Sequence, residues 1–564
     1  MPYRIFYTLV FAGIFILAGC QGEVDNKQPA SPPISAVPPG PNTVGKVMPP
    51  DAAPLDQQIY RWLLIEPTSL DANVAIYQAQ SGVFAFEGLT WLNHDSELVP
   101  GAADRWESSE DGTIWTFYLR KDAKWSDGRP VTAHDFVYTF IRAVDPASAN
   151  VYAFFYYPIK GAKAFSQGIT KDRSTIGVRA VDDYTLVIET DGPCPYLPQI
   201  TAFTGSGAVP RWQVEKYEEK WTEPEYCVTN STFKLERWDA GQSFEFVLNP
   251  YYNGPQKAYL ERLIGTFIGA ETAVSTLPYE NNEVDFQRVM AREIPALRNH
   301  PILGKELAFY SAFDTYFLIF NTEEKPFDDL RVRQAISHVI DREVLSNVVL
   351  QGTATPAYSM LPPGYPGDAG HTLDNIQRYD PDAGRKLLAE AGYPNGRGFP
   401  RKDLILRGAD MKHAAEAIQQ MIKDQLNVDL SINILEARTY SIALYQWKLP
   451  ISIGSFSQDY PDPNNMLATV WRSQPKPFGR QPWKNEAFDK LVDDAAREMN
   501  QEKRAIMYAD AQRILVEDVG GAFLFFNKEA SLRKPWLKGL KRNKVGEYPY
   551  RNLIDIYIAN NVQR

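Results

Sequence analysis

The sequence predicts an α/β protein with several lobes, and three observations lead to this class. Short runs rich in β-branched and aromatic residues alternate with helical patterns along the whole chain. About 510 residues follow residue 54, which is too many for one hydrophobic core and enough for roughly three lobes. No internal repeat with a period of about 20–50 residues is visible, so solenoids and propellers are excluded.

Each predicted element follows from a local pattern. The runs predicted as strands mix Val, Ile, Thr, Phe, Tyr and Trp, whereas the predicted helices place apolar residues at i, i+3 and i+4. The glycines of GYPNG (392–396) indicate a helix C-cap and a turn. In chain order, the predicted strands are 84–92, 113–121, 185–190, 244–249, 315–321 and 403–408, and the predicted helices are 135–144, 332–338, 342–349, 382–391, 413–426 and 502–517.

The most informative stretch is residues 98–144, which reads as a strand, a turn and a helix. Asp-Gly and Pro in WSDGRP (125–130) are typical turn residues. Thr132 stands three residues before Asp135 and ahead of an apolar run, which predicts a helix N-cap with an acid in the first turn. By itself this pattern indicates only an ordinary supersecondary unit.

The amino-acid sequence of this unit resembles that of the extracytoplasmic solute-binding proteins of peptide-type ABC importers (solute-binding protein family 5), especially the oligopeptide-binding proteins. Further blocks follow in the family's order, and together they extend over roughly residues 60–560. Several ordered blocks carry more weight than one short motif. These blocks are 66–71, 86–89, 178–190, 220–230, 325–336, 386–394, 457–463 and 534–540.

This resemblance implies a two-lobed periplasmic-binding-protein type II fold with an extra third lobe and a hinge that closes the lobes over a central cleft. It places lobe I at 55–87, 211–315 and 529–564, lobe II (the extra lobe) at 88–210, and lobe III at 316–528.

The N-terminus reads as a lipoprotein signal peptide, residues 1–19. Arg4 precedes an apolar run that is short for a membrane span, and Leu17-Ala18-Gly19-Cys20 resembles the bacterial lipobox. A lipidated Cys20 would anchor the chain to a bacterial membrane, facing the periplasm or the exterior. A plain signal peptide with a coincidental Cys, or a short signal-anchor helix, is the alternative. Residues 20–54 are rich in Pro, Gly, Ser and Ala, which predicts a disordered tether.

With Cys20 lipidated, Cys194 and Cys227 remain as a pair in an oxidising compartment. This favours a disulfide slightly over two free buried thiols. The family resemblance gives no support to the disulfide.

Composition and motifs argue against several functions. The net charge is −10 and Lys and Arg form no long run, which argues against nucleic acid as a partner. The six histidines are scattered, and the chain has no metal-site spacing, nucleophile elbow or phosphate loop. We therefore expect no catalysis, no cofactor and no metal, although a pair of carboxylates facing each other in a hydrolase cannot be read from sequence.

The segment with the most functional promise is ISIGSFSQDYPDPNNML (451–467). A strand-like start ends in an acidic loop, and Asp462 before Pro463 predicts the N-cap of a further helix. By position alone, Asp459 before Tyr-Pro would be a turn residue. The resemblance implies another role, because in oligopeptide-binding proteins the Asp of this motif pairs with the α-ammonium group of the ligand.

Other ligand-binding candidates rest on weaker resemblance. Tyr152 matches a cleft Tyr of the family, and an amphipathic surface Tyr is its alternative. Arg331 and Arg333 are expected to face solvent or a salt bridge. The remaining candidates are the neighbours of Asp459 and the residues where the family offers backbone to its ligand: Phe456, Ser457, Gln458, Ile76, Tyr77 and Gln78.

The departures from the family bear on the ligand. Ala437, Leu444 and Ile453 stand where oligopeptide binders carry a wall Trp and two arginines that meet ligand carboxylates. The resemblance thus implies a lipid-anchored receptor that delivers short peptides to an ABC permease and ATPase, and a monomer is the default expectation. The alternatives are another solute (an oligosaccharide, a metal chelate or an opine), a receptor that only signals, and a secreted hydrolase.

Overall fold

The computed structural model describes residues 40–76, 79, 84–269, 275–541 and 553–560. The predicted signal peptide, Cys20 and the tether up to residue 39 lie outside the described residues. All described residues belong to one unit, Pro38–Arg564.

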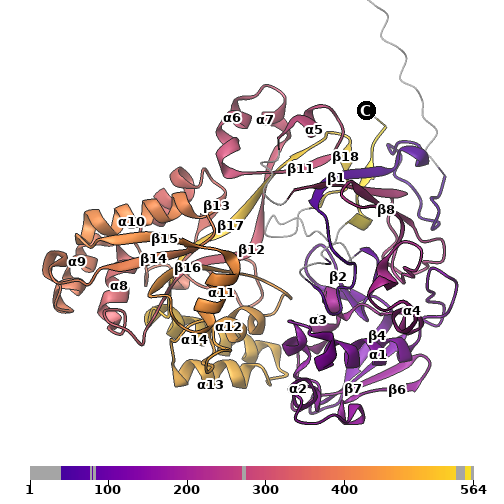
Figure 1. Ribbon diagram of the computed structural model, residues 1–564, viewed down its shortest axis with the longest axis horizontal. Helices are drawn as coiled ribbons and strands as arrows, with labels where there is room; N and C mark the ends of the chain where they lie inside the picture. Colours follow the sequence, from indigo (N-terminus) through magenta and orange to yellow (C-terminus); the bar gives the residue numbers. More distant parts are fainter. Residues whose placement is uncertain (1–39, 77–78, 80–83, 270–274, 542–552, 561–564) are drawn as a thin grey trace, which may run out of the picture. The chain divides into compact units, whose positions relative to one another are not determined.

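A mixed sheet is the largest element of the described residues (Figure 1). It has 11 strands in the order β15-β14-β16-β12-β17-β11-β1-β10-β9-β8, with β13 paired to β17. Parallel pairing joins β1 to β10 and β11, and β14 to β15 and β16. The strands are β1 (Ile59–Ile65), β8 (Phe233–Asp239), β9 (Ser243–Leu248), β10 (Arg262–Ile268), β11 (Phe286–Val289), β12 (Leu307–Phe320), β13 (Ala354–Pro356), β14 (Lys402–Arg407), β15 (Leu430–Leu435), β16 (Ile451–Ser457) and β17 (Gly521–Arg533).

Strands β12 and β17 connect the two ends of this sheet. They are 14 and 13 residues long and pair with each other antiparallel. The N-terminal end of β12 pairs with one side of β17, and β11 pairs with the other side. The C-terminal half of β12 pairs with β16. The register of β12 against β17 shifts between Ser311 and Thr315. A shift of this kind bends a strand locally. The boundaries predicted between lobes I and III, 315/316 and 528/529, both fall inside these two strands.

The segment 88–210 forms a second, smaller sheet with the order β4-β5-β7-β6. Helix α1 (Ala133–Ala143) packs on it, and the Asp135 carboxylate accepts a hydrogen bond from the Thr132 N–H at 2.8 Å, as a capping box requires. Of the strand predicted at 84–92, only Thr90–Leu92 is extended, as β2. The strands are β2 (Thr90–Leu92), β3 (Leu98–Pro100), β4 (Ala103–Ser108), β5 (Ile114–Leu119), β6 (Val178–Asp182) and β7 (Thr185–Glu189).

The predicted helices are found within one or two residues of their expected ends, with one change. The stretch predicted as a helix at 342–349 forms a π-helix over Val344–Val349. Two further strands are β18 (Leu537–Lys538) and β19 (Tyr557–Ile558). The other helices are α2 (Ala162–Ser166), α3 (Leu197–Thr201), α4 (Arg211–Tyr217), α5 (Leu277–Glu280), α6 (Ile294–Asn299), α7 (Leu303–Glu306), α8 (Leu330–His338), α9 (Pro381–Glu390), α10 (Lys412–Leu426), α11 (Ala437–Tyr445), α12 (Pro463–Trp471), α13 (Glu486–Ala495) and α14 (Gln501–Glu517).

Both faces of the sheet are buried around the C-terminal half of β12. Leu318 and Phe320 belong to one hydrophobic cluster, which contains residues of α8 and α10. Phe317 and Ile319 belong to another, which contains residues of α12, α13 and α14. Successive side chains of a strand point to opposite faces, so one apolar run serves both clusters.

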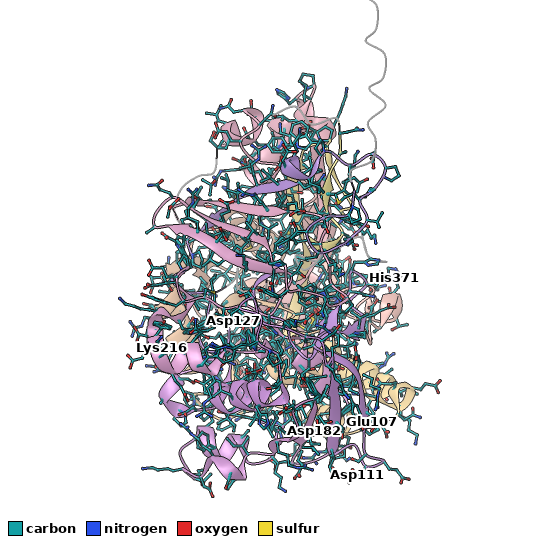
Figure 2. All side chains as sticks on the ribbon, turned by 90° about the vertical axis from the view of Figure 1, so that its right-hand side faces the viewer. Glu107, Asp111, Asp127, Asp182, Lys216 and His371 are labelled. Carbon is teal, nitrogen blue, oxygen red and sulfur yellow. The ribbon has the colours of Figure 1, made fainter. Side chains whose placement is uncertain are left out.

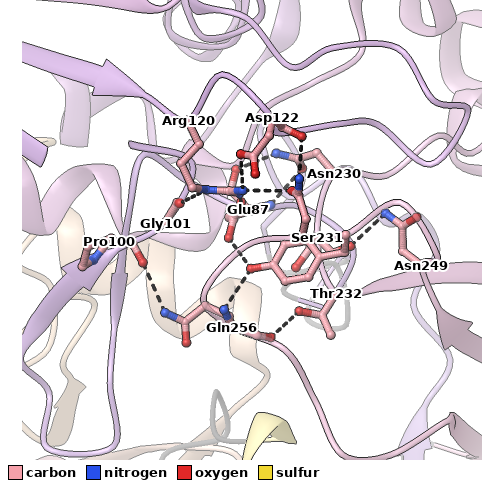
Figure 3. Close-up of polar contacts among 12 residues, drawn as sticks. Glu87, Pro100, Gly101, Arg120, Asp122, Asn230, Ser231, Thr232, Asn249 and Gln256 are labelled. Carbon is pink, nitrogen blue, oxygen red and sulfur yellow. Dashed lines mark hydrogen bonds and ion pairs between the residues drawn. The ribbon is translucent and has the colours of Figure 1, made fainter. Parts of the chain in front are cut away.

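A buried ion pair joins the segment 88–210 to the residues on either side of it (Figure 3). The Arg120 guanidinium donates to the Glu87 carboxylate at 2.9 Å, to the Gly101 carbonyl at 2.9 Å and to the Asn253 amide oxygen at 3.1 Å. The Tyr252 hydroxyl donates to the other Glu87 oxygen at 2.6 Å. Glu87 and Arg120 are 1% and 7% exposed, so this network fixes predicted lobes I and II together.

The predicted tether is wrong from residue 40 onward. The Asn42 side chain donates to the Ala258 carbonyl at 2.7 Å, and the Lys46 ammonium donates to the carbonyls of Lys257 and Ile554. Val44 is buried as well. The composition of this stretch concealed the packing, because backbone carbonyls contributed by distant residues hold its few polar side chains in place.

The predicted disulfide is also wrong, because Cys194 and Cys227 are free thiols. Each is held in its own surroundings: the Cys194 N–H donates to the Gly112 carbonyl, and the Cys227 N–H to the Glu223 carbonyl. Both lie in a hydrophobic cluster, where burial raises the pKa of each thiol to about 12. A free Cys can thus serve as a small apolar core residue.

Candidate functional site

Asp459 lies in the short link between β16 and α12, and its neighbours hold that link in one conformation. Asp462 is the N-cap of α12, as predicted, and its carboxylate accepts from the Asn464 N–H at 2.9 Å. The buried Arg504 of α14 donates to both Asp462 oxygens at 2.5 and 2.6 Å. The Tyr365 hydroxyl donates to the Tyr460 carbonyl at 2.8 Å. The backbone after Asp459 is therefore anchored by residues of α12, of α14 and of the segment around Tyr365.

The carboxylate of Asp459 is held by two neutral donors. Asn465, fully buried in the first turn of α12, donates from its amide to one oxygen at 3.0 Å, while its own amide oxygen accepts from the Asp459 N–H at 2.8 Å. The Tyr152 hydroxyl donates to the other oxygen at 3.2 Å. This last bond joins the segment 88–210 to the segment 316–528. The structure thus brings together the two most specific residues of the predicted site.

Aromatic rings surround this junction. Tyr152 stacks on Phe203 with ring centroids 5.5 Å apart. Tyr460, next to Asp459, meets Phe155 edge-on at 5.5 Å and stacks on Tyr196 at 6.0 Å. The rings thus pack against Tyr152, which donates to the Asp459 carboxylate, and against Tyr460, the residue that follows Asp459.

The electrostatics of Asp459 are those of a carboxylate without a counter-ion. Burial raises its pKa, and the hydrogen bonds from Asn465 and Tyr152 and the positive charge of Arg480 offset part of that rise. Among the described residues, none forms an ion pair with Asp459. A half-buried carboxylate without a cation is costly for a protein to keep, and it favours the approach of a positively charged group.

A second carboxylate lies nearby, on the strand next to β16. Asp314 of β12 is paired with Ser457, two residues before Asp459, and is 9% exposed. Burial raises its pKa to about 6, with hydrogen bonds from Ser457 and Asn527 lowering it in part. Its Oδ1 atom is buried and has no hydrogen-bond partner among the described residues.

The other predicted site residues fall in different surroundings. Phe456 is 6% exposed and packs in the same cluster as Phe313 and Met466, so its ring supports the link from behind. Ser457 is exposed, and Gln458 is half-buried with its N–H bonded to the Phe313 carbonyl at 3.0 Å. Ile76 is half-buried and packs against the hydrophobic cluster of predicted lobes I and II. Tyr77 and Gln78 lie outside the described residues.

Other features of the described chain do not form a competing site. No group of three or more His, Cys, Asp or Glu residues is arranged to hold a metal ion in the described ranges. His371, for example, has a side chain that is 97% exposed (Figure 2). Arg331 and Arg333 form ion pairs with Asp329 and Asp518. No helix within the described ranges has the length and apolar character needed to span a membrane.

Two surface hollows lie away from Asp459. One, of about 560 Å³, is lined by residues from 301–308 and 533–540. The other, of about 940 Å³, is lined by residues from 104–105, 118–122 and 182–185, with many exposed charged side chains. Neither contains a residue of the 451–467 segment, so the case for the site rests on the contacts of Asp459 itself.

Comparison with known proteins identifies the family. Residues 97–478 match the model of the bacterial extracellular solute-binding proteins, family 5. The chain belongs to this family. The predicted fold class is confirmed: family 5 proteins have the two-lobed type II fold of periplasmic binding proteins, and the mixed α/β sheet described above agrees with it.

Several relatives resemble nearly the whole chain. The periplasmic oligopeptide-binding protein OppA of Salmonella typhimurium is 31% identical over 491 residues, which cover 84% of this chain and 86% of OppA. The probable deoxycholate-binding periplasmic protein YgiS of Escherichia coli is 29% identical over 515 residues, 89% of this chain and 94% of YgiS. The unliganded open form of MppA, a periplasmic murein tripeptide binding protein, matches with a TM-score of 0.74 at 30% identity, covering 90% of this chain and 98% of MppA.

Sequence reasoning missed three residues next to the site of this family 5 protein. Asn465 could have been found, because it falls in the first turn of a helix whose start was predicted correctly. Asp314 had a weaker signal, a lone acid directly before the apolar run predicted as a strand at 315–321. Arg480 had none, because it lies in a Pro- and Gly-containing loop between α12 and α13, and only the tertiary fold brings it near Asp459.

Proposed function

We propose that this protein is the substrate-binding component of an ABC importer and captures short peptides by their N-terminal ammonium group at Asp459. The observation that carries the proposal is the half-buried carboxylate of Asp459, held by neutral Tyr152 and Asn465 and not ion-paired within the described part of the chain. The names of OppA and MppA, both peptide binders, support a peptide as ligand.

The chemistry of the ligand explains why one fixed carboxylate is enough. Every free peptide carries an N-terminal ammonium, whatever its side chains are. When the lobes close and water leaves, the attraction between the two charges grows, although desolvation takes back part of the gain. The peptide backbone would add strand-like hydrogen bonds to the protein main chain, which do not depend on side-chain identity. Bridging waters would let different side chains fit.

The same proposal covers the predicted lobes and anchor. Lobe III, residues 316–528, rotates against lobes I and II about β12 and β17, and the ligand binds the closed form better and shifts the population toward it. The hydrogen bond between Tyr152 of lobe II and Asp459 of lobe III supports this closure. Lipid chains on Cys20 hold the monomeric receptor at the membrane, where it delivers its ligand to the permease and ATPase.

Native mass spectrometry of freshly purified protein tests the ligand class directly. We expect co-purified peptides of mixed mass, whereas a sugar ladder or a steroid acid would overturn the peptide proposal. In a second measurement, di- to pentaalanine should raise the melting temperature, and N-acetylation of the same peptides should remove most of that rise. Equal shifts from free and acetylated peptides would contradict the role of Asp459.

A further inference from the structure

The smaller of the two surface hollows, of about 560 Å³, combines positive charge with an apolar wall. The basic side chains that line it are Lys305, Arg533, Lys534 and Lys538. Glu306 is the single acidic residue of the lining, so the cations outnumber the anions by three. The apolar part of the wall includes the exposed Ile302 and the buried Leu537. Such a lining suits a ligand that carries both a negative charge and an apolar part.

Lys534 is the most enclosed of these cations. It is 7% exposed, and no other lysine among the described residues is buried. Within the described ranges, no residue accepts a hydrogen bond from its ammonium group or forms an ion pair with it. The half-buried Lys46, in contrast, donates to two backbone carbonyls at 2.6 and 2.7 Å. Because lysine is rarely buried without a partner, the ammonium of Lys534 calls for an acceptor in the hollow that it lines.

Two aromatic rings hold Lys534 in place without neutralising it. Its ammonium lies 4.1 Å from the centroid of the Tyr279 ring and 5.4 Å from that of Trp536. The Tyr279 hydroxyl donates to Glu306 at 2.6 Å and the Trp536 indole N–H donates to Asp285 at 2.9 Å, so both rings are fixed. Burial lowers the pKa of Lys534, and nearby acidic charges offset part of this effect. An anion in the hollow would favour the charged form and accept from its N–H groups.

The wall of this hollow is joined to the part of the chain that leads to Cys20. Strand β18, which lines the hollow, pairs with β19, and the Ile558 carbonyl of β19 accepts from the Ala53 N–H at 2.8 Å. The first described residue, Gly40, follows Cys20 by 20 positions. At about 3.5 Å per residue, a lipidated Cys20 would keep Gly40 within about 70 Å of the membrane. The proposed anchor thus keeps this part of the protein near a lipid surface.

We propose that this hollow binds the headgroup of an anionic phospholipid, with the phosphate at Lys534 and the first acyl carbons against the apolar wall. Basic pockets close to a membrane surface recognise such headgroups through their charge. The inference rests on the proposed function for the lipid anchor at Cys20, which supplies the membrane, and it does not depend on Asp459. Binding would hold lobe I at the membrane surface.

Titration of the full-length protein, in a non-ionic detergent, with dihexanoylphosphatidylglycerol tests this inference. Dihexanoylphosphatidylcholine has the same chains without net charge, and glycerol 3-phosphate has the phosphate without chains. We expect the wild-type protein to bind the phosphatidylglycerol about 10- to 100-fold more tightly than either. Lys534→Met should weaken that binding by at least about tenfold and Lys538→Gln by about fivefold. Lys503→Gln, which removes an exposed lysine of α14 outside the hollow, is the matched control and should change nothing.

The possible outcomes separate this inference from the proposed function. If the phosphatidylglycerol does not bind, or binds no better than the phosphatidylcholine, the inference is wrong. If glycerol 3-phosphate binds as tightly as the lipid, the hollow takes a free phosphate and the assignment to a lipid is wrong. Trialanine, titrated into the same samples, tests the proposed function separately and should bind the wild-type protein and Lys534→Met alike. The comparison of lipids uses the wild-type protein, and Lys538 is exposed, so the test decides even where Lys534→Met fails to fold.

Discussion

Replacing Asn465 with Ala should separate the positioning of Asp459 from the general stability of the fold. Asn465 is fully buried and makes two bonds to Asp459, one to its backbone N–H at 2.8 Å and one to its carboxylate at 3.0 Å. Losing a bond to a charged group costs about 1.5–3 kcal/mol, and water can replace part of it because Asp459 is half-buried. We expect the free energy of unfolding to fall by about 2–3 kcal/mol.

Binding provides the readout that a purely structural role would not change. Without the Asn465 amide the Asp459 carboxylate turns more freely and its pKa rises further, because that hydrogen bond now lowers it. Trialanine should therefore bind about tenfold more weakly to Asn465→Ala, with the acid limb of its pH profile shifted upward, whereas N-acetyltrialanine should be unaffected. Urea denaturation and calorimetry between pH 5 and 8 measure both effects.

An exposed asparagine supplies the control for this experiment. Asn433 lies on the edge strand β15, and Asn433→Ala should change neither stability nor binding. If Asn465→Ala loses the expected stability but keeps the full preference for a free amine and an unshifted pH profile, Asn465 only holds the helix start, and the reasoning about the carboxylate is wrong.

Two further predictions concern stability. Burial raises the pKa of Asp314 to about 6, above its ordinary 3.8, so the contribution of Asp314 to stability should fall as pH rises from 4 to 6. Asp314→Asn should remove this loss of up to about 3 kcal/mol, and parallel pH curves of unfolding free energy for the two proteins would contradict it. Arg120→Met should lower the free energy of unfolding by about 3–5 kcal/mol because it leaves Glu87 buried and unpaired, and adding Glu87→Gln should restore part of this loss. Arg179→Met removes an exposed ion pair and should cost under about 1 kcal/mol, so equal losses in the two variants would contradict the role of the buried network.

The local parts of the fold could be predicted from the sequence because their causes are local. The Thr132 capping box and the Asp462 N-cap each depend on a few neighbouring residues, and both helices begin where these residues indicate. The long strands β12 and β17 were only partly predicted. Their ends near Leu307 and Arg533 are extended because they pair with each other and with β11, which sequence pattern alone does not reveal.

The errors have a common physical cause, which is that distant partners decide the outcome. Residues 40–54 have the composition of a linker, yet Asn42 and Lys46 find acceptors more than 200 residues away. A disulfide between Cys194 and Cys227 was predicted because two cysteines remained in an oxidising compartment, whereas the fold buries each as a free thiol beside different backbone partners. At the site, Asp459 was found through resemblance, but the fold alone brings Arg480 near it.

The most direct test of the central claim is a thermodynamic cycle that measures the coupling between the Asp459 carboxylate and the amine of the ligand. Trialanine and N-acetyltrialanine are titrated into the wild-type protein and into Asp459→Asn, with Glu110→Gln as the control for loss of an exposed acid. We predict that acetylation costs the wild-type protein about 2–5 kcal/mol of binding free energy and costs Asp459→Asn far less. The same cost in both proteins would contradict the account.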